Sequence, residues 1–292
     1  MTTPSRMRRA LAIALLASAA LALGGCDILR VWFPSHEHET TPPELPAGLT
    51  APALLVFTKT NGFRHTEAIP AGVALIEEIA KSRGWSVFHT ENGAVFNAEQ
   101  LAKFQATVWH QVSGDVLDAA QRDALKSWIE AGGGFVGVHG AGGDTEYDWR
   151  WYVEELIGAQ FIGHTMGPQF QTATWRTENP LHPASAKLPE KWQHEEEIYS
   201  FERTARDRAG FLVLVNVDES SYSPRLKFLG SDTDIAMKGG DHPMVWHHCV
   251  GDGRALYSAL GHQAKSYAEP EMRVLLEGAM AWALRVEGIG CS

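Results

Sequence analysis

Four runs of strand length, rich in apolar residues, lie in the first half of the chain, at 53–58, 85–90, 106–111 and 134–139. Between them, apolar residues recur at helical spacing from about Ile69 and again between Asp118 and Gly132, with a short helix expected after Asn97. Strands that alternate with helices in this way predict a parallel sheet covered by helices on both faces.

The second half of the chain has a less regular pattern. A short helix is expected at 151–157, and a closing helix at 270–286 has one apolar face. Strands are expected at 169–176, 211–217, 243–250 and 254–260. No internal repeat or linker interrupts the region, so one domain over 53–286 is predicted, followed by a C-terminal tail, 287–292.

The first 52 residues differ in composition from the rest. Three arginines precede the apolar run 10–23, which is shorter than the ~20 residues of a membrane-spanning helix and is typical of a signal peptide. The run ends in Leu23-Gly24-Gly25-Cys26, which resembles a bacterial lipobox. That resemblance implies removal of residues 1–25, lipidation of Cys26 and a location in the cell envelope, with the domain in the periplasm or otherwise outside the cytoplasmic membrane. Residues 26–52 hold five prolines and are expected to form a solvated tether.

Composition narrows the class of protein. The 292 residues are 45% hydrophobic, which excludes a disordered chain, and the formal charge of -10 disfavours nucleic acid as a partner. Of the 3 Cys, Cys249 lies in an apolar strand, which favours a buried thiol; a disulfide with Cys291 is left open.

A glycine-rich segment around the fourth predicted strand is the strongest local motif. Its glycines precede or lie within the strand, so its G-x-G-x-x-G spacing does not indicate a dinucleotide fingerprint. The strand instead delivers His139 into a turn, Gly140-Ala141-Gly142-Gly143. Ligands of parallel sheets gather at the carboxyl ends of strands, where Arg64 and His65 are also expected because they follow the first strand.

Four segments resemble the trehalose utilisation (ThuA-like) family: TKTNGFRH (58–65), AGGGFVGVHGAGGDTEYDWRWY (131–152), GDHPMVWHH (240–248) and RALYSALGHQAKSYAEP (254–270). The resemblance implies a flavodoxin-like, doubly wound and mostly parallel sheet in three α/β/α layers, akin to class I glutamine amidotransferases. His139 stands where those enzymes carry a nucleophilic Cys, which argues against glutaminase activity.

Two interpretations of the histidines remain open. One is a divalent metal such as Zn, held by His65, His139 and His262 with Glu196 or Asp144 as the carboxylate. The other is metal-free acid–base catalysis by His139 with Asp144 or Glu196, with His65 as its partner. Residues expected to contact a substrate are Arg64, Thr145, Tyr147, Trp149, His164 and Trp246.

The resemblance implies an enzyme that acts on a sugar or a keto-sugar, with a sugar oxidoreductase as its pathway partner. The membrane is expected to be contacted only through the lipid. A carbohydrate-binding lipoprotein without catalysis, and a metal-dependent hydrolase of another small molecule, are the alternatives.

Overall fold

The computed structural model describes residues 30, 33–144 and 147–291. The predicted signal peptide, the proposed lipidation site Cys26 and the candidate substrate residue Thr145 lie outside these residues. Among the residues described, no helix has both the length and the apolar character needed to cross a bilayer.

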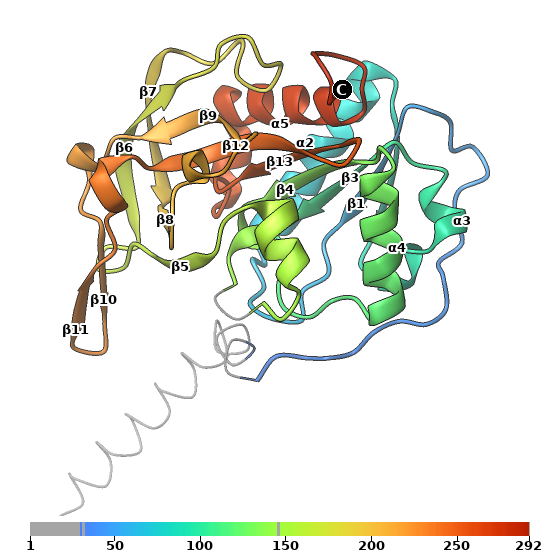
Figure 1. Cartoon of the computed structure of the whole chain (residues 1–292), viewed down its shortest axis with the longest axis horizontal. Helices are drawn as coiled ribbons and strands as arrows, with labels where there is room; N and C mark the ends of the chain where they lie inside the picture. Colours follow the sequence, from blue (N-terminus) through green and yellow to red (C-terminus); the bar gives the residue numbers. More distant parts are fainter. Residues whose placement is uncertain (1–29, 31–32, 145–146, 292) are drawn as a thin grey trace, which may run out of the picture.

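A nine-stranded sheet forms the centre of the molecule, in the order β2-β1-β3-β4-β13-β12-β9-β6-β7 (Figure 1). Its parallel half contains β2 (Ser86–Thr90), β1 (Ala53–Phe57), β3 (Ala106–His110), β4 (Gly134–Val138) and β13 (Gly253–Ser258). Four of these strands, β1, β3, β4 and β13, are buried along their whole length, as the continuous apolar runs of the first three predict.

Helices cover both faces of the parallel half. Helix α2 (Ala68–Arg83) and the closing helix α5 (Pro270–Ala283) contact each other, whereas α3 (Ala98–Leu101) contacts α4 (Ala119–Glu130). Helix α2 connects β1 to β2 and α4 connects β3 to β4, and these two connections run in opposite directions across the sheet. Because both crossovers are right-handed, the two helices lie on opposite faces. The direction in which successive strands are added to the sheet changes at β1, which makes this position the topological switch point. In open parallel sheets, ligands bind there, at the carboxyl ends of the strands.

The other half of the sheet is antiparallel. It contains β12 (Pro243–Val250), β9 (Leu212–Val217), β6 (Phe170–Thr177) and the edge strand β7 (Lys191–Glu197). The first three agree with the predicted strands to within a few residues. Strand β7 was not predicted, because its sequence KWQHEEE is too polar to suggest a strand.

Two further strand pairs lie outside the main sheet. Strand β5 (Phe161–His164) pairs with β8 (Tyr199–Phe201), and β10 (Arg225–Phe228) pairs with β11 (Ser231–Asp234) in a hairpin. Figure 1 shows this hairpin projecting from the body of the molecule. A π-helical segment, Tyr152–Ile157, takes the place of the predicted helix at 151–157.

The segment predicted to be a solvated tether lies against the domain from residue 33 onwards. The buried ammonium of Lys59 donates to the backbone oxygen of Glu37 and to the carboxylate of Glu39, each at 2.7 Å. The same carboxylate accepts the backbone N–H of Gly93 at 2.8 Å, and His38 contacts Asp115 at 3.2 Å. The polar residues of this segment therefore bind it to the protein surface over 33–52, where every residue stays exposed or half-buried.

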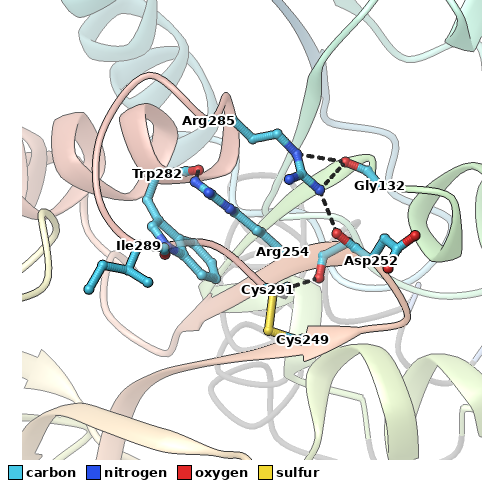
Figure 2. The surroundings of a disulfide bond; sticks show 9 residues. Gly132, Cys249, Asp252, Arg254, Trp282, Arg285, Ile289 and Cys291 are labelled. Carbon is cyan, nitrogen blue, oxygen red and sulfur yellow. Dashed lines mark hydrogen bonds between the residues drawn. A yellow bond between two sulfur atoms is a disulfide. The ribbon is translucent and has the colours of Figure 1, made fainter.

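A disulfide joins Cys249 on β12 to Cys291 in the C-terminal tail (Figure 2). Cys249 is exposed, so the expectation of a buried thiol was wrong; alternation along the strand turns it away from the core between His248 and Val250, which are buried. The tail is also held by the indole of Trp282, which donates to the backbone oxygen of Ile289 at 2.8 Å.

The substitution Cys249→Ser is expected to lower the free energy of unfolding by about 2–4 kcal/mol, because the bond closes a long loop in the unfolded chain. Urea unfolding of oxidised protein measures the change. Wild-type protein under reducing conditions and the variant Cys249→Ser/Cys291→Ser should show the same loss. An unchanged urea midpoint in all three would show that the bond contributes nothing to stability.

Candidate functional site

Three histidines from three loops meet at the carboxyl edge of the parallel strands. His65 follows β1, His139 follows β4 and His262 follows β13. The ring of His65 lies 4.9 Å from that of His139 and 4.6 Å from that of His262, between centroids. The convergence expected from the strand ends is present, and it occurs beside the reversal in strand order.

The carboxylate that joins them is Glu197, at the end of β7. Its Oε2 lies 2.9 Å from His262 Nδ1 and 3.5 Å from His139 Nε2, and these two ring nitrogens are 3.1 Å apart. One potential ligand atom from each of His65, His139, Glu197 and His262 lies within 4.8 Å of all the others. This group does not include Asp144 or Glu196, the carboxylates that the sequence suggested.

Burial and charge set the protonation of this group. Burial by itself raises the pKa of Glu197, but hydrogen bonds with His139 and His262 outweigh it and leave that pKa well below its usual value. Burial lowers the pKa of His262, but the hydrogen bond and the charge of Glu197 reverse the shift and raise it. Burial, followed by the neighbouring His139 and His262, lowers the pKa of His65 well below its usual value, so that His65 is neutral at pH 7.

The orientation of His139 fixes which of its nitrogens faces the cluster. Its Nδ1 lies 2.7 Å from the backbone oxygen of Ala259, which can only accept, so Nδ1 carries a proton. With a proton on Nε2 as well, His139 donates to Glu197; without that proton, the Nε2 lone pair faces the centre of the cluster and is available to a metal. A carbonyl behind a histidine ring is a common outer partner of a metal-ligating imidazole.

The glycine turn exists because aromatic rings pack directly against it. A Cβ at Gly142 would lie 2.6 Å from the ring of Tyr257, and one at Gly143 would lie 2.7 Å from the hydroxyl of Tyr199. His139 itself has a left-handed backbone, with φ of 47°, which is uncommon for a residue other than glycine. The Tyr257 hydroxyl donates to the His139 backbone oxygen at 2.9 Å and holds this conformation.

The donor set fits a first-row divalent metal. Ligand atoms ~2.1 Å from a shared ion and at right angles to one another are about 3 Å apart, close to the separations among His139, His262 and Glu197. Two imidazoles and one carboxylate on one face of an ion are a known coordination pattern that leaves positions open. His65 adds a further donor, and its buried Nδ1 has no hydrogen-bond partner among the described residues.

The family model for ThuA, described as trehalose utilisation, matches residues 53–283. The chain belongs to the ThuA family. A ThuA-like protein from Bacteroides uniformis ATCC 8492 has 22% identity and a TM-score of 0.66, over 83% of this chain and 95% of that one. Another from Parabacteroides merdae ATCC 43184 has 16% identity and a TM-score of 0.58, over 80% and 90%. These likenesses confirm the predicted fold class. No curated protein sequence matches the chain.

In this ThuA-family chain, Glu196 lies beside the histidines and links two segments of backbone through hydrogen bonds. Its Oε1 accepts the backbone N–H of Glu197 at 2.9 Å and of His262 at 3.2 Å. Its Oε2 accepts the N–H of Gly261 at 2.7 Å and lies 3.3 Å from His194 Nε2. One buried carboxylate therefore connects the end of β7, which carries Glu197, to the loop that carries His262.

Two further residues, Glu269 and His164, support the two glutamates and their partners. Glu269 lies 2.6 Å from His194 Nδ1, on the side of the ring opposite Glu196. His164 Nδ1 lies 3.0 Å from Glu197 Oε1, and Gln169 donates to the same oxygen at 2.5 Å. His164, predicted to contact substrate, is thus placed to orient Glu197.

The other predicted substrate residues lie in varied surroundings. Trp246 is fully buried in the core and donates to the backbone oxygen of Ile157 at 2.8 Å. Arg64 pairs with Glu91 at 2.7 Å. Trp149 and Tyr147 are half-buried and stack on Tyr152.

Glu197 and Tyr199 are the residues of the site that sequence reasoning did not assign. Tyr199 is buried, and its hydroxyl lies 3.0 Å from His139 Nε2. Burial raises the pKa of Tyr199 well above its usual value, so its hydroxyl stays protonated. The motif Glu195-Glu196-Glu197 stands out in the sequence, but only the folded chain shows that Glu197 is the glutamate whose carboxylate lies beside His139 and His262.

The substitution Glu196→Gln is expected to weaken Zn²⁺ binding by about 10–100-fold, since an amide offers one acceptor oxygen in place of two and the ligand-bearing loops lose hydrogen bonds that link them. Competition with a chromophoric chelator measures the Kd. The matched control is Glu195→Gln, whose side chain is 39% exposed and pairs with Lys265 at the surface. Equal affinity in both variants would remove Glu196 from this role.

Proposed function

We propose that this ThuA-family protein is an envelope-anchored enzyme that acts on a sugar or a keto-sugar through one divalent metal ion. The observation that carries the proposal is the buried group His65, His139, Glu197 and His262, whose potential ligand atoms lie within 4.8 Å of one another. The family's description, trehalose utilisation, supports a carbohydrate as the substrate class.

The chemistry follows from the donor set. When bound, a divalent ion with open positions polarises a substrate carbonyl or hydroxyl oxygen as a Lewis acid. Glu197, His139 and His262 would hold the ion, and His164 and Gln169 would hold Glu197 in place. The protonated hydroxyl of Tyr199 lies beside the ligand nitrogen of His139 and can donate a hydrogen bond to an oxygen that gains negative charge.

A keto-sugar suits this site better than an unmodified sugar. A carbonyl oxygen is the group that a Lewis acid and a hydroxyl donor polarise together, whereas an ordinary sugar hydroxyl gains less from such a pair. A sugar oxidoreductase acting earlier in the same route would supply the oxidised substrate. The absence of a Cys at position 139 is the reason for not proposing glutaminase activity.

The disulfide supports an envelope location. Structural disulfides persist in oxidising compartments such as the periplasm and are rare in the cytosol. The Cys249–Cys291 bond therefore agrees with export directed by the N-terminal signal, which we propose from the sequence.

The substitution His139→Ala is expected to reduce both metal content and turnover of oxidised disaccharides by about 100-fold, because a proposed metal ligand is lost. Elemental analysis of the purified protein measures the metal, and chelation followed by addition of Zn, Mn, Fe or Ni identifies the active ion. The control His89→Ala removes an exposed histidine that contacts Thr58 and should retain both.

Native disaccharides should be turned over more slowly than their oxidised forms. Full activity in protein that contains no metal would refute the metal-dependent mechanism, and saturable sugar binding without product would favour a carbohydrate-binding protein. Equal turnover by wild type and His139→Ala would remove His139 from the reaction.

A further inference from the structure

The hairpin β10–β11 ends in a turn that displays two large apolar side chains. Phe228 pairs with Ser231, so the turn consists of Leu229 and Gly230 alone. Phe228 is 53% exposed and Leu229 is 89% exposed. These adjacent apolar residues lie at the tip of a projecting hairpin, where no other part of the described chain buries them (Figure 1).

The backbone of this turn makes the choice of leucine unfavourable for folding. Both central residues have positive φ, 48° at Leu229 and 86° at Gly230. Turns of this type prefer asparagine or aspartate at the first position, and a bulky side chain there is strained. Strain of this kind is concentrated at functional positions, so Leu229 points to a role outside the fold.

Charge on the hairpin does not select a partner. Arg225 lies 2.9 Å from Asp232 and 3.4 Å from Asp234, and Lys227 lies 3.9 Å from Asp232. The two cations and two carboxylates of the strands therefore balance. We therefore expect a partner surface to bind the tip through apolar contacts, with an affinity that depends little on salt concentration.

The hairpin arises from the same edge of the sheet as the histidine site. The backbone N–H of Met166 donates to Arg225 at 3.0 Å, and that of Lys227 donates back to Met166 at 2.9 Å. Met166 follows β5, whose His164 contacts Glu197. Leu226 is the residue bridged to Met166, and Leu229 follows it by three residues. At about 3.3 Å per residue, the tip therefore stands roughly 10 Å beyond this root.

The N-terminal segment joins the domain at this edge as well. The backbone N–H of Ser35 donates to Asn61 at 2.8 Å, just beyond the carboxyl end of β1. Ser35 follows Cys26 by nine residues, which span at most about 30 Å. If Cys26 carries the proposed lipid, the carboxyl edge of the sheet therefore stays within about 30 Å of the bilayer.

We propose that Phe228 and Leu229 insert into the surface of the lipid bilayer to which the chain is anchored. The proposal rests on the lipid anchor at Cys26 and is independent of the reaction at the histidine site. Two attachments, the lipid and the tip, then hold the domain in one orientation, with the carboxyl edge of the sheet toward the membrane. This goes beyond the expectation that the lipid alone contacts the membrane.

The test uses the full, lipidated chain in vesicles of phosphatidylethanolamine and phosphatidylglycerol. Leu229→Cys is labelled with an environment-sensitive fluorophore and compared with labelled Leu181→Cys, a residue that is 90% exposed in the connection between β6 and β7. The label at 229 should shift to the blue and be quenched at least twofold by nitroxide-bearing lipids, whereas the label at 181 should be unchanged. Equal behaviour at the two positions overturns the proposal.

A second variant separates membrane contact from folding. Leu229→Asn suits the turn and should leave the melting temperature unchanged or raise it by about 1–3 °C. In this background, a label on Phe228→Cys should lose at least half of its quenching by nitroxide lipids. Undiminished quenching would show that Leu229 does not contribute to the contact.

Two further outcomes would overturn the proposal. A blue shift that grows with protein density, without lipid quenching, would mean that the tip binds a second copy of the chain. A Cys26 without acyl groups by mass spectrometry would remove the anchor on which the proposal rests. Turnover by Leu229→Asn reports on the proposed reaction separately, because the hairpin tip contributes no residue to the histidine site.

Discussion

The buried carboxylate of Glu197 determines how the candidate site is arranged. An anion removed from water costs several kcal/mol unless charges and hydrogen bonds compensate it. Here Gln169 lies 2.5 Å, His262 2.9 Å and His164 3.0 Å from its oxygens, and His139 is 3.5 Å away. These partners come from separate segments of the chain, so the antiparallel half of the sheet must be correctly placed before the parallel half can complete the site.

Glu196 extends this dependence to the backbone. Its two oxygens accept N–H groups from both the strand end and the loop after β13, so the positions of Glu197 and His262 are set by the same side chain. The glycines of the turn at His139 also determine how the site is arranged. They allow the rings of Tyr199 and Tyr257 to pack where any side chain would collide, and those rings then hold the strained His139 in place.

Much of the fold could be predicted because its parallel strands are buried on both faces. Continuous apolar runs of strand length such as 53–58 and 134–139 indicate buried strands, and their alternation with amphipathic helices leads to a doubly wound sheet. The edge strand β7 gives no such signal, because its buried residues include His194, Glu196 and Glu197, which are usually exposed. In the N-terminal segment, proline and charge indicate solvation, and its contact with the domain depends on a distant partner, the buried Lys59 that pairs with Glu39.

The sequence alone determined the family, the parallel half of the sheet, the turn at His139 and the three histidines that follow strands. All of these depend on local pattern or on the rule that parallel strands end at a common edge. Only the tertiary structure decided that Glu197, rather than Asp144 or Glu196, joins those histidines, that Trp246 lies in the core, and that Cys249 is bonded to Cys291. Each of these depends on the direction of a side chain, which is set by strand register and by packing between residues far apart in the chain.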